Sequence, residues 1–449
     1  MSVNLSSIGL SGISAAEAGI AAIESNITNA SNPNYSAESV ILGVRDGPLG
    51  EGTGVNVLGT VRSEAPFLAT QINSTSSSQS YNAAFSQVAT LAEQIVAPGA
   101  QGDLSQALQS LFNAFTNLSA QPADATVRAS AINAAAQFAQ VDQNISLNLG
   151  RAVADQRSQI SNIVTQVNEL SGQIAQLNGQ IVAVQANGQN GGALKDQRDG
   201  LVVQLANLIG ASADSNGNVS VGGVPLVSGS SALTLSTTGS GSSLGLQVVL
   251  SKGSMQVQLG QIGGQLAGVF AGAASVEQLQ TRIDAYATSV ATAFNGQHQA
   301  GFGLDGSTGN PLFLISGLGG PIGINPAINT QNLAAAASAA GLPGDGSNAT
   351  AIAALANSLG VDPAYPGSTL GQAFGQIESD FGTTVQNAAN NQQQAAASLQ
   401  SLSQLKGSIT GVSLNDQLTH LVQFQNLLQA SARAVQTAND LTTFLIQEL

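Results

Sequence analysis

The sequence predicts a mainly α-helical protein with an inserted β-rich domain, and three features of its pattern support this fold class. Both ends of the chain carry apolar residues at heptad spacing. A third heptad pattern runs through the middle of the chain, from Ile160 to Val184. Between residues 210 and 259, Gly, Ser, Val and Leu dominate, and short apolar runs alternate with turn residues. We therefore expect a bundle of long helices, a small antiparallel β module, and discontinuous domains that are nested in one another.

The two terminal segments are expected to be helices that pair as a coiled coil. Their apolar residues recur at alternating steps of three and four, which is the spacing of a helix that packs on a partner helix. Chain ends usually fray unless something holds them, so we expect these ends to be buried against each other or against other subunits. The apolar positions are Ile13, Ala16, Ile20, Ile23 and Ile27 in the first segment and Leu414, Leu418, Leu421, Phe424, Leu428, Ala432, Val435, Ala438, Leu441 and Leu445 in the last.

The interior pattern is typical of a helical bundle that the β module interrupts. Helical spacing extends over residues 67–186, with breaks near 98–103 and 121–124. It returns over residues 276–294, and a long polar helix is expected over 370–409. The two halves of the bundle must therefore fold back on each other, which also brings the chain ends together.

These changes of pattern divide the chain into four expected parts. The expected parts are a terminal coiled-coil assembly domain with an extended linker, residues 1–66 plus 411–449; a helical bundle domain, residues 67–209 plus 260–300 and 367–410; a β-rich inserted domain, residues 210–259; and a loop-rich segment, residues 301–366, whose domain membership is left open.

The composition argues against several classes of function. The formal net charge is -14 and basic residues do not cluster, so nucleic acid is not an expected partner. Without Cys, the chain has no disulfide or thiolate-metal framework. We expect no membrane insertion, because no run approaches the roughly 18 apolar residues of a span. No cleaved secretory signal is expected either, since the first basic residue is Arg45. With 4% aromatic residues, helices with small-residue seams are expected rather than a dense aromatic core.

Two short motifs match enzyme signatures by spacing alone. Gly301, Gly303 and Gly306 fit the dinucleotide pattern G-x-G-x-x-G, but that site needs a strand before it and a helix after it. Here a helix precedes the motif and Pro311 follows it, so a plain loop is expected. The run from Gly241 through Ser243 to Gly245 fits a nucleophile elbow, yet it lies in a Gly- and Ser-rich stretch between expected strands.

The titratable residues also favour structural roles. His298 and His420 are the chain's two histidines, and neither has a carboxylate at helix spacing to orient it for catalysis. Asp196 and Asp199 alternate with Lys195 and Arg198, which indicates a salt-bridged helix face. Residues 214–218 suggest a hairpin turn rather than a calcium loop, because no acidic residue stands at the twelfth position. We therefore expect no enzyme activity, no cofactor, no metal and no catalytic residue.

The segment from Ser7 to Tyr35 resembles the N-terminal signature that flagellar rod, hook and hook-associated proteins share. Its matching residues include Gly9, Leu10, Asn26, Ile27, Thr28, Asn29, Ala30 and the pair Asn34-Tyr35. The family usually has Gly before this Tyr and Arg-Gln soon after it, where this chain has Asn34, Ala37 and Glu38. Asn accepts a left-handed backbone more readily than other non-Gly residues, so the turn can survive.

A more selective resemblance identifies the family. Residues 192–210, GALKDQRDGLVVQLANLIG, resemble the FlgK family of flagellar hook-associated proteins, which form the hook-filament junction. Supporting matches are VSVGGVPLVSG at 219–229, AFNGQHQAGFGLDGSTGNPLF at 293–313 and GVSLNDQLTHLVQFQNLLQASARAVQTANDL at 411–441. The ordered set spans most of the chain.

The resemblance implies a structural protein that is exported by the flagellar type III system and polymerises at the hook tip. Its implied partners are further copies of itself, the hook protein, the second hook-associated protein, and an export chaperone that binds the C-terminal helix. Its implied location is outside the cell, at the hook-filament junction of the bacterial flagellum. The terminal helices are expected to order only when neighbouring subunits bury them.

The expected assembly interface combines the terminal heptads with three residues of the N-terminal signature. Those residues are Ile13, Ile20, Ile23, Ile27, Asn26, Asn29, Tyr35, Leu418, Leu421, Phe424, Leu428, Val435, Leu441 and Leu445. Three alternatives stay open: another axial protein such as a hook, rod or second junction protein, a secreted coiled-coil adhesin, and a secreted hydrolase. The last would need a pocket with converging polar groups.

Overall fold

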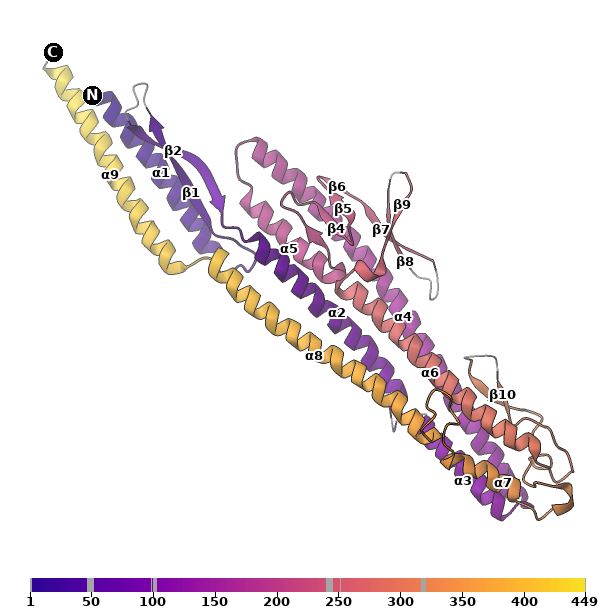
Figure 1. Cartoon of the computed structure of the whole chain (residues 1–449). Helices are drawn as coiled ribbons and strands as arrows, with labels where there is room; N and C mark the ends of the chain where they lie inside the picture. The colour runs from indigo at the N-terminus through magenta and orange to yellow at the C-terminus, as the bar shows by residue number, and fades with distance from the viewer. Residues whose placement is uncertain are drawn as a thin grey trace. The chain divides into compact units, whose positions relative to one another are not determined.

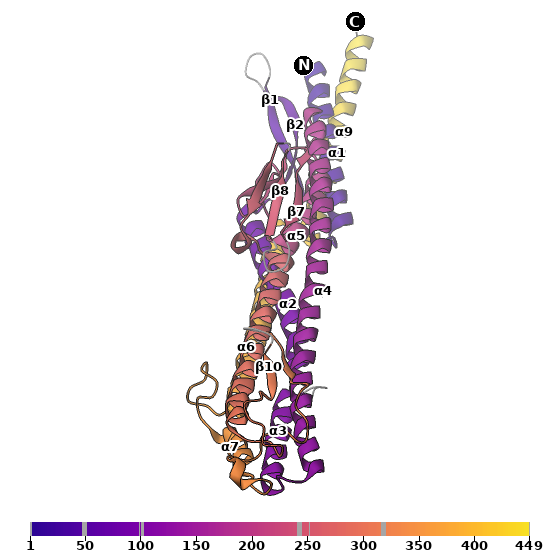
Figure 2. The same ribbon diagram turned by 90° about the vertical axis from the view of Figure 1, so that its right-hand side faces the viewer.

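A computed structural model describes residues 2–46, 52–97, 99, 103–239, 245–250, 252–315 and 320–448. Figure 1 shows the chain as a ribbon and Figure 2 shows the same ribbon from a second side. The chain forms two compact units, each discontinuous in sequence, as the fold class predicts. Unit 1 comprises Met1–Ser80, Ile163–Gly264 and Gln393–Leu449, and unit 2 comprises Tyr81–Asn162 and Gln265–Gln392. The four-part division expected from the sequence is finer and remains a prediction.

Long helices dominate both units, which confirms the predicted class. Residues 67–186, which were expected to be helical with two breaks, form three helices. Local hydrogen bonds help to set where these helices begin. Asp103 caps the first turn of the helix that begins at Leu104, because its carboxylate accepts from Gln106 N at 3.1 Å. The described residues form α1 (Ser2–Asn29), α2 (Pro66–Val96), α3 (Leu104–Ala120), α4 (Ala125–Ala186), α5 (Gly192–Ile209), α6 (Gly264–Ala300), α7 (Ser347–Ala354), α8 (Leu370–Thr410) and α9 (Leu414–Gln447).

The β module lies in unit 1, directly after α5, and its strands are antiparallel as predicted. It holds a four-stranded sheet in the order β3-β4-β5-β6 and a three-stranded sheet in the order β7-β8-β9. Asn168 of α4 holds the second sheet, since its amide both donates to Leu235 O at 2.9 Å and accepts from Leu235 N at 2.8 Å. The strands are β3 (Ser212–Ala213), β4 (Val219–Val221), β5 (Val224–Ser228), β6 (Ser231–Ala232), β7 (Thr234–Thr238), β8 (Gly245–Val249) and β9 (Ser254–Val257).

The turn between β3 and β4 has the predicted hairpin chemistry. The Asp214 carboxylate accepts from the backbone N–H groups of Asn216 and Asn218, each at 2.9 Å. These bonds tighten the turn locally, as Asx turns do. The match to a nucleophile elbow lies largely outside the described residues, because Gly241 and Ser243 belong to 240–244.

A β-hairpin follows α1 in unit 1, where the sequence indicated only an extended linker. It consists of β1 (Glu38–Asp46) and β2 (Gly52–Arg62), paired antiparallel with two register shifts. Gly54 and Gly59 have φ angles of 126° and 138°, which residues with a side chain rarely adopt. Such glycines weakened the strand pattern and hid the hairpin from sequence reasoning.

Unit 2 has an aromatic core, and here the expectation of small-residue seams alone was wrong. The heptad of α6 from Val276 to Phe294 is buried at every position. Phe294 lies at the centre, with ring centroids 5.4 Å from Phe112, 5.7 Å from Phe115 and 5.9 Å from Phe313. The last of these belongs to β10 (Phe313–Ile315), which pairs with β11 (Ile322–Ile324). A few aromatic residues suffice because they are concentrated in one unit.

Buried polar side chains anchor the loop-rich segment 301–366 within unit 2. Arg128 of α4 is 1% exposed and donates to three backbone carbonyls, those of Pro122, Thr330 and Leu333. His298 is fully buried, with Nδ1 2.7 Å from Asn310 O and Nε2 accepting from Ala334 N at 3.0 Å. Burial lowers the pKa of His298, so the neutral form that accepts this bond is favoured. The structural role expected for His298 is confirmed, while His420 is exposed on α9.

The glycine motif at 301–306 is a loop, as predicted. Phe302 pairs with Ala336 in an isolated bridge, and Gly306 has a φ of 79°. A Cβ at Gly303 would lie 2.7 Å from Gln331 O, so the glycine permits two loop segments to approach closely.

One helix has the length and composition of a membrane span, which the search for uninterrupted apolar runs did not single out. Residues 5–29, within α1, are long and apolar enough to cross a membrane by length and composition, with a mean hydropathy of 1.3. Within the protein, 44% of the apolar window is buried, and core helices of ordinary proteins pass the same test.

Arg128→Met is predicted to destabilise unit 2, because three buried carbonyls would lose their donor. We expect a loss of about 3 kcal/mol in the free energy of unfolding, measured by urea denaturation of the full chain. Arg151→Met is the matched control, since Arg151 lies on the same helix and is exposed. Equal stability of the two variants would show that Arg128 does not hold the loops.

Candidate assembly surface

The terminal helices α1 and α9 pack side by side within unit 1 in opposite directions. Figures 1 and 2 both show them adjacent, with the N- and C-termini at the same end. The facing positions confirm this orientation, because they advance along α1 as they recede along α9. The facing pairs are Gly9 and Val435, Gly12 and Ser431, Gly19 and Phe424, and Asn26 and Gln417.

Glycines on α1 set how closely the two helices approach. A Cβ at Gly9 would lie 2.6 Å from a methyl carbon of Val435, and one at Gly12 would lie 3.2 Å from Cβ of Ser431. Gly19 leaves room for the ring of Phe424 in the same way. Any side chain at these positions would push the helices apart.

The helices thus pair as predicted, but the tight seam differs from the expected apolar stripe. Ile13 and Ile20 stand one position after Gly12 and Gly19, and both isoleucines are only partly buried. Ile23 belongs to the buried side of the helix, with 4% exposure. The sequence held a signal for the true seam, since Gly9, Gly12, Ala16 and Gly19 also follow steps of three and four.

The amide of Asn26 joins four segments of unit 1. It donates to Glu38 O at 2.8 Å and to Gln417 Oε1 of α9 at 3.0 Å. It accepts from Glu38 N at 2.8 Å and from the Tyr35 hydroxyl at 2.9 Å. With 1% exposure, Asn26 fixes the start of the hairpin against both terminal helices. Ser11 holds the far end of the hairpin, because its Oγ accepts from Val55 N at 3.1 Å.

Arg62 at the end of β2 ties the hairpin to α5. Its guanidinium lies 2.6 Å from the carboxylate of Asp196 and 2.8 Å from that of Asp199. Burial raises the pKa of Asp196, and the Arg62 charge opposes this rise. The salt-bridged face expected on α5 is therefore corrected: Asp196 and Arg198 are buried, and the main partner of both carboxylates comes from the hairpin.

Large apolar side chains remain exposed on α1, on the β1–β2 hairpin and on α9. In α9, only Ser431 and Ala438 are buried among the described residues. Monomeric proteins rarely expose many large apolar residues together, and such surfaces usually bind other proteins. We call the following set the terminal apolar surface: Ile8 and Leu10 of α1, Ile41, Leu42, Val44, Val57, Leu58 and Val61 of the hairpin, and Leu414, Leu418, Val422, Leu427, Leu441, Phe444, Leu445 and Ile446 of α9.

The residues expected at an interface fall into three groups in the structure. Asn26 and Ile23 are buried inside unit 1. Leu418, Leu441 and Leu445 are exposed, at 54%, 49% and 52%. The others are partly buried: Ile13, Ile20, Ile27, Asn29, Tyr35, Leu421, Phe424, Leu428 and Val435. Sequence reasoning did not find the hairpin residues or Val422, Phe444 and Ile446, which lie off the heptad stripe.

One cavity of unit 1 has several charged side chains in its wall. This cavity of about 330 Å³ opens at the base of the hairpin, with Arg62, Arg198 and Asp199 in its wall. These charges are paired with one another. Within the described ranges, no group of three or more His, Cys, Asp or Glu residues is placed to hold a metal ion.

Known proteins of one family are similar to this chain. A family model described as the helical domain of flagellar hook-associated protein FlgK matches residues 89–313, half of the chain. Flagellar hook-associated protein 1 of Salmonella typhimurium strain LT2 is 27% identical over 339 residues, which cover 68% of this chain and 58% of that protein. The protein of the same name from Bacillus subtilis strain 168 is 24% identical, over 96% of this chain and 95% of its own length. The match to the Salmonella relative thus leaves more than a third of that protein unmatched.

A solved structure is also similar. The flagellar hook junction protein FlgK from Burkholderia pseudomallei aligns with a TM-score of 0.50 and 27% sequence identity. The alignment covers 55% of this chain and 46% of that one.

Gly12→Cys combined with Ser431→Cys is predicted to form a disulfide within the chain. The two Cβ positions lie close enough for a bridge after a small adjustment, and the chain has no cysteine of its own. Mild oxidation followed by non-reducing electrophoresis would measure the yield. Gly12→Cys with Gln423→Cys is the control, since Gln423 is exposed and lies about two turns away from Ser431. Equal yields from both pairs would contradict the antiparallel register.

Proposed function

This chain belongs to the FlgK family of flagellar hook-associated proteins, and we propose that it is a structural adaptor of the hook-filament junction. The observation that carries the proposal is the terminal apolar surface, which the chain itself leaves uncovered. In this proposal the protein is exported by the flagellar type III system, polymerises at the hook tip, and acts outside the cell.

Assembly would proceed through the two terminal helices and the hairpin. The fourteen residues that the sequence assigned to an interface have two roles here. Those in the seam, such as Phe424 and Val435, hold α9 on α1, and those outside it, such as Leu418 and Leu441, contact neighbouring subunits. A helix pair with glycine and alanine in its seam buries little apolar area, and isolated helices are marginal in water. The ends would therefore order fully only when neighbours cover them, which couples folding to assembly.

The family and the terminal apolar surface together support the proposed partners. Further copies of the chain form the junction layer, with the hook protein on one side and the second hook-associated protein on the other. Before export, the apolar side chains of α9 would need a chaperone, because such a surface promotes aggregation. No enzymatic step is part of the proposal.

Removing the gene is predicted to leave hooks without filaments, with monomeric flagellin shed into the medium, as seen by electron microscopy. A wild-type copy should restore filaments. A copy with Leu428→Asp should fail, because a charge in the α1–α9 seam opposes burial. Leu418→Asp should fail as well, because this exposed side chain is proposed to contact a neighbouring subunit.

Val182→Asp is the matched control, since Val182 is an exposed apolar residue of α4. Filaments should return with this variant. Normal filaments with Leu428→Asp would refute the interface, and normal filaments in the deletion strain would refute the function. A strain with intact filaments but lost surface adhesion would instead support the adhesin alternative.

Removing roughly the last thirty residues, most of the α9 heptad, is predicted to abolish binding of the export chaperone. A pull-down with the bacterium's own chaperone measures this, with the Val182→Asp chain as the control that retains binding. Circular dichroism should show that the truncated chain keeps the helices of unit 2, which do not depend on α9. Unchanged capture of the truncated chain would place the chaperone site elsewhere.

A further inference from the structure

Two buried carboxyl groups, one on α4 and one on α6, lie in the interior of unit 2, and the proposed function does not use them. Asp142 of α4 is fully buried, and Asp284 of α6 is 3% exposed. The two carboxyl groups interact electrostatically, since the charge on Asp284 acts on Asp142. A carboxylate without a cationic partner rarely stays ionised in such a place.

The hydrogen bonds around the pair are incomplete. Asp142 Oδ2 accepts from Ile322 N at 3.0 Å, and Asp284 is bonded to the Ser146 hydroxyl. The other oxygen of each group, Oδ1, is buried without a hydrogen-bond partner among the described residues. Buried polar atoms normally have partners, so both orphan oxygens point to a missing proton or ligand.

The surrounding charges do not neutralise the pair. Arg151 of α4 is exposed and bonds to Asn148. Arg157 of α4 pairs with Glu277 of α6, and Arg282 of α6 pairs with Asp380 of α8. Among described groups, β11 contributes a backbone N–H to Asp142 and no charge. A second negative charge at this position would therefore have no counterion.

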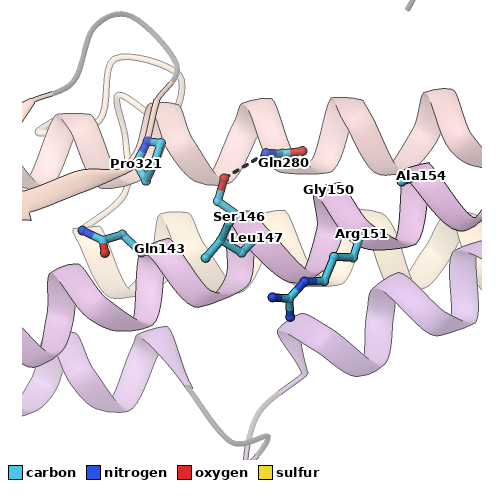
Figure 3. Close-up of a pocket in the computed structure, with 8 residues that line it drawn as sticks. All are labelled: Gln143, Ser146, Leu147, Gly150, Arg151, Ala154, Gln280 and Pro321. Atoms are coloured by element: carbon cyan, nitrogen blue, oxygen red, sulfur yellow. Dashed lines mark hydrogen bonds between the residues drawn. The ribbon is translucent and has the colours of Figure 1, made fainter. Parts of the chain in front are cut away.

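A hollow on the surface of unit 2 is lined in part by two polar residues that lead towards the pair. Figure 3 shows Ser146 of α4 and Gln280 of α6 in its wall, joined by a hydrogen bond of 2.8 Å. Because Gln280 donates to Ser146, the serine hydroxyl is free to donate to Asp284. Asp284 is thus one hydrogen bond away from Ser146, which lines the hollow. Gly150 also lines the hollow, and a Cβ at this position would meet no other atom within 4 Å.

We propose that Asp142 and Asp284 form a proton-binding pair that holds α4 against α6 when protonated and loosens their packing when the proton is lost. A proton on one acid turns an orphan acceptor into a donor and removes one of two like charges. This inference is independent of the flagellar function.

The direction of the pH effect follows from the state of each group in the folded chain. Burial, helped by the Asp284 charge and opposed by the hydrogen bond from Ile322 N–H, raises the pKa of Asp142 to about 7. Burial also raises the pKa of Asp284, to about 6. Folding therefore favours the protonated forms, so this stabilisation is complete below the usual pKa of Asp and is lost as the pH rises through about 7. His298 acts in the opposite direction, because burial lowers its pKa and acid favours its unfolded, charged form.

The test compares the full chain with Asp142→Asn combined with Asp284→Asn, which keeps the shape and removes the ionisation. Thermal unfolding is followed by circular dichroism from pH 5 to pH 9. The difference in Tm between variant and wild type should rise with pH, by about 3 °C or more across the range. Asp155→Asn is the matched control, because Asp155 is an exposed residue of α4. This control should follow the wild-type curve.

A carbon-13 NMR titration of labelled aspartate should show two carboxyl carbons that titrate at about pH 6 and 7. Two carboxyls titrating near pH 4, or a Tm difference that is constant with pH, would overturn the proposal. If Ca²⁺ or Mg²⁺ raised the Tm of the wild type at pH 8.5 but not that of the double variant, the pair would be a cation site and the proton model would be wrong.

Discussion

The close approach of α1 and α9 is the constraint on which the terminal part of unit 1 depends. It exists because glycines at 9, 12 and 19 present backbone, rather than side chains, to α9. With the helices this close, Asn26 reaches Gln417 while it also holds the hairpin, so one amide sets the positions of three elements. The same geometry limits the apolar area that the two helices bury between them. α9 is thus held along one narrow strip and leaves most of its apolar residues uncovered.

Sequence periodicity predicted the terminal helices and their pairing because heptad spacing depends only on residues close in the chain. It could not place the seam, because a heptad of isoleucines and a heptad of glycines and alanines lie side by side on α1, and apolar counting favours the larger residues. Ile13 and Ile20 therefore flank the contact that Gly12 and Gly19 make. The partner of Asp196 was also beyond reach, since Arg62 lies 134 positions away and only the folded hairpin brings it near. Local charge spacing pointed to Lys195 and Arg198 instead.

Unit 2 is stabilised differently, and this explains where the sequence was least informative. Its loop-rich segment shows weak patterning because buried polar groups, rather than apolar residues alone, hold it. Arg128 gathers three carbonyls, and Asn348 donates to Ala334 O at 2.9 Å. Such bonds satisfy the backbone of irregular loops without any repeat in the sequence. The segment also contributes apolar residues to the core of unit 2, where Leu312, Phe313 and Leu333 are buried with Phe294.

The exposed apolar residues of α9 provide a driving force for assembly. Fully burying a large apolar side chain contributes about 1.5–3 kcal/mol, so a half-exposed one has about 1 kcal/mol still to gain. Eight large apolar residues are exposed among the described residues of α9, which gives a gain on the order of 8 kcal/mol if neighbours cover them all. That is as large as the net stability of a typical domain. A surface with this much to gain can order the terminal helices during association, provided that unit 2 folds beforehand on its own core. Because the aromatic core belongs to unit 2 and the terminal apolar surface to unit 1, unit 2 can fold before neighbouring subunits order the terminal helices.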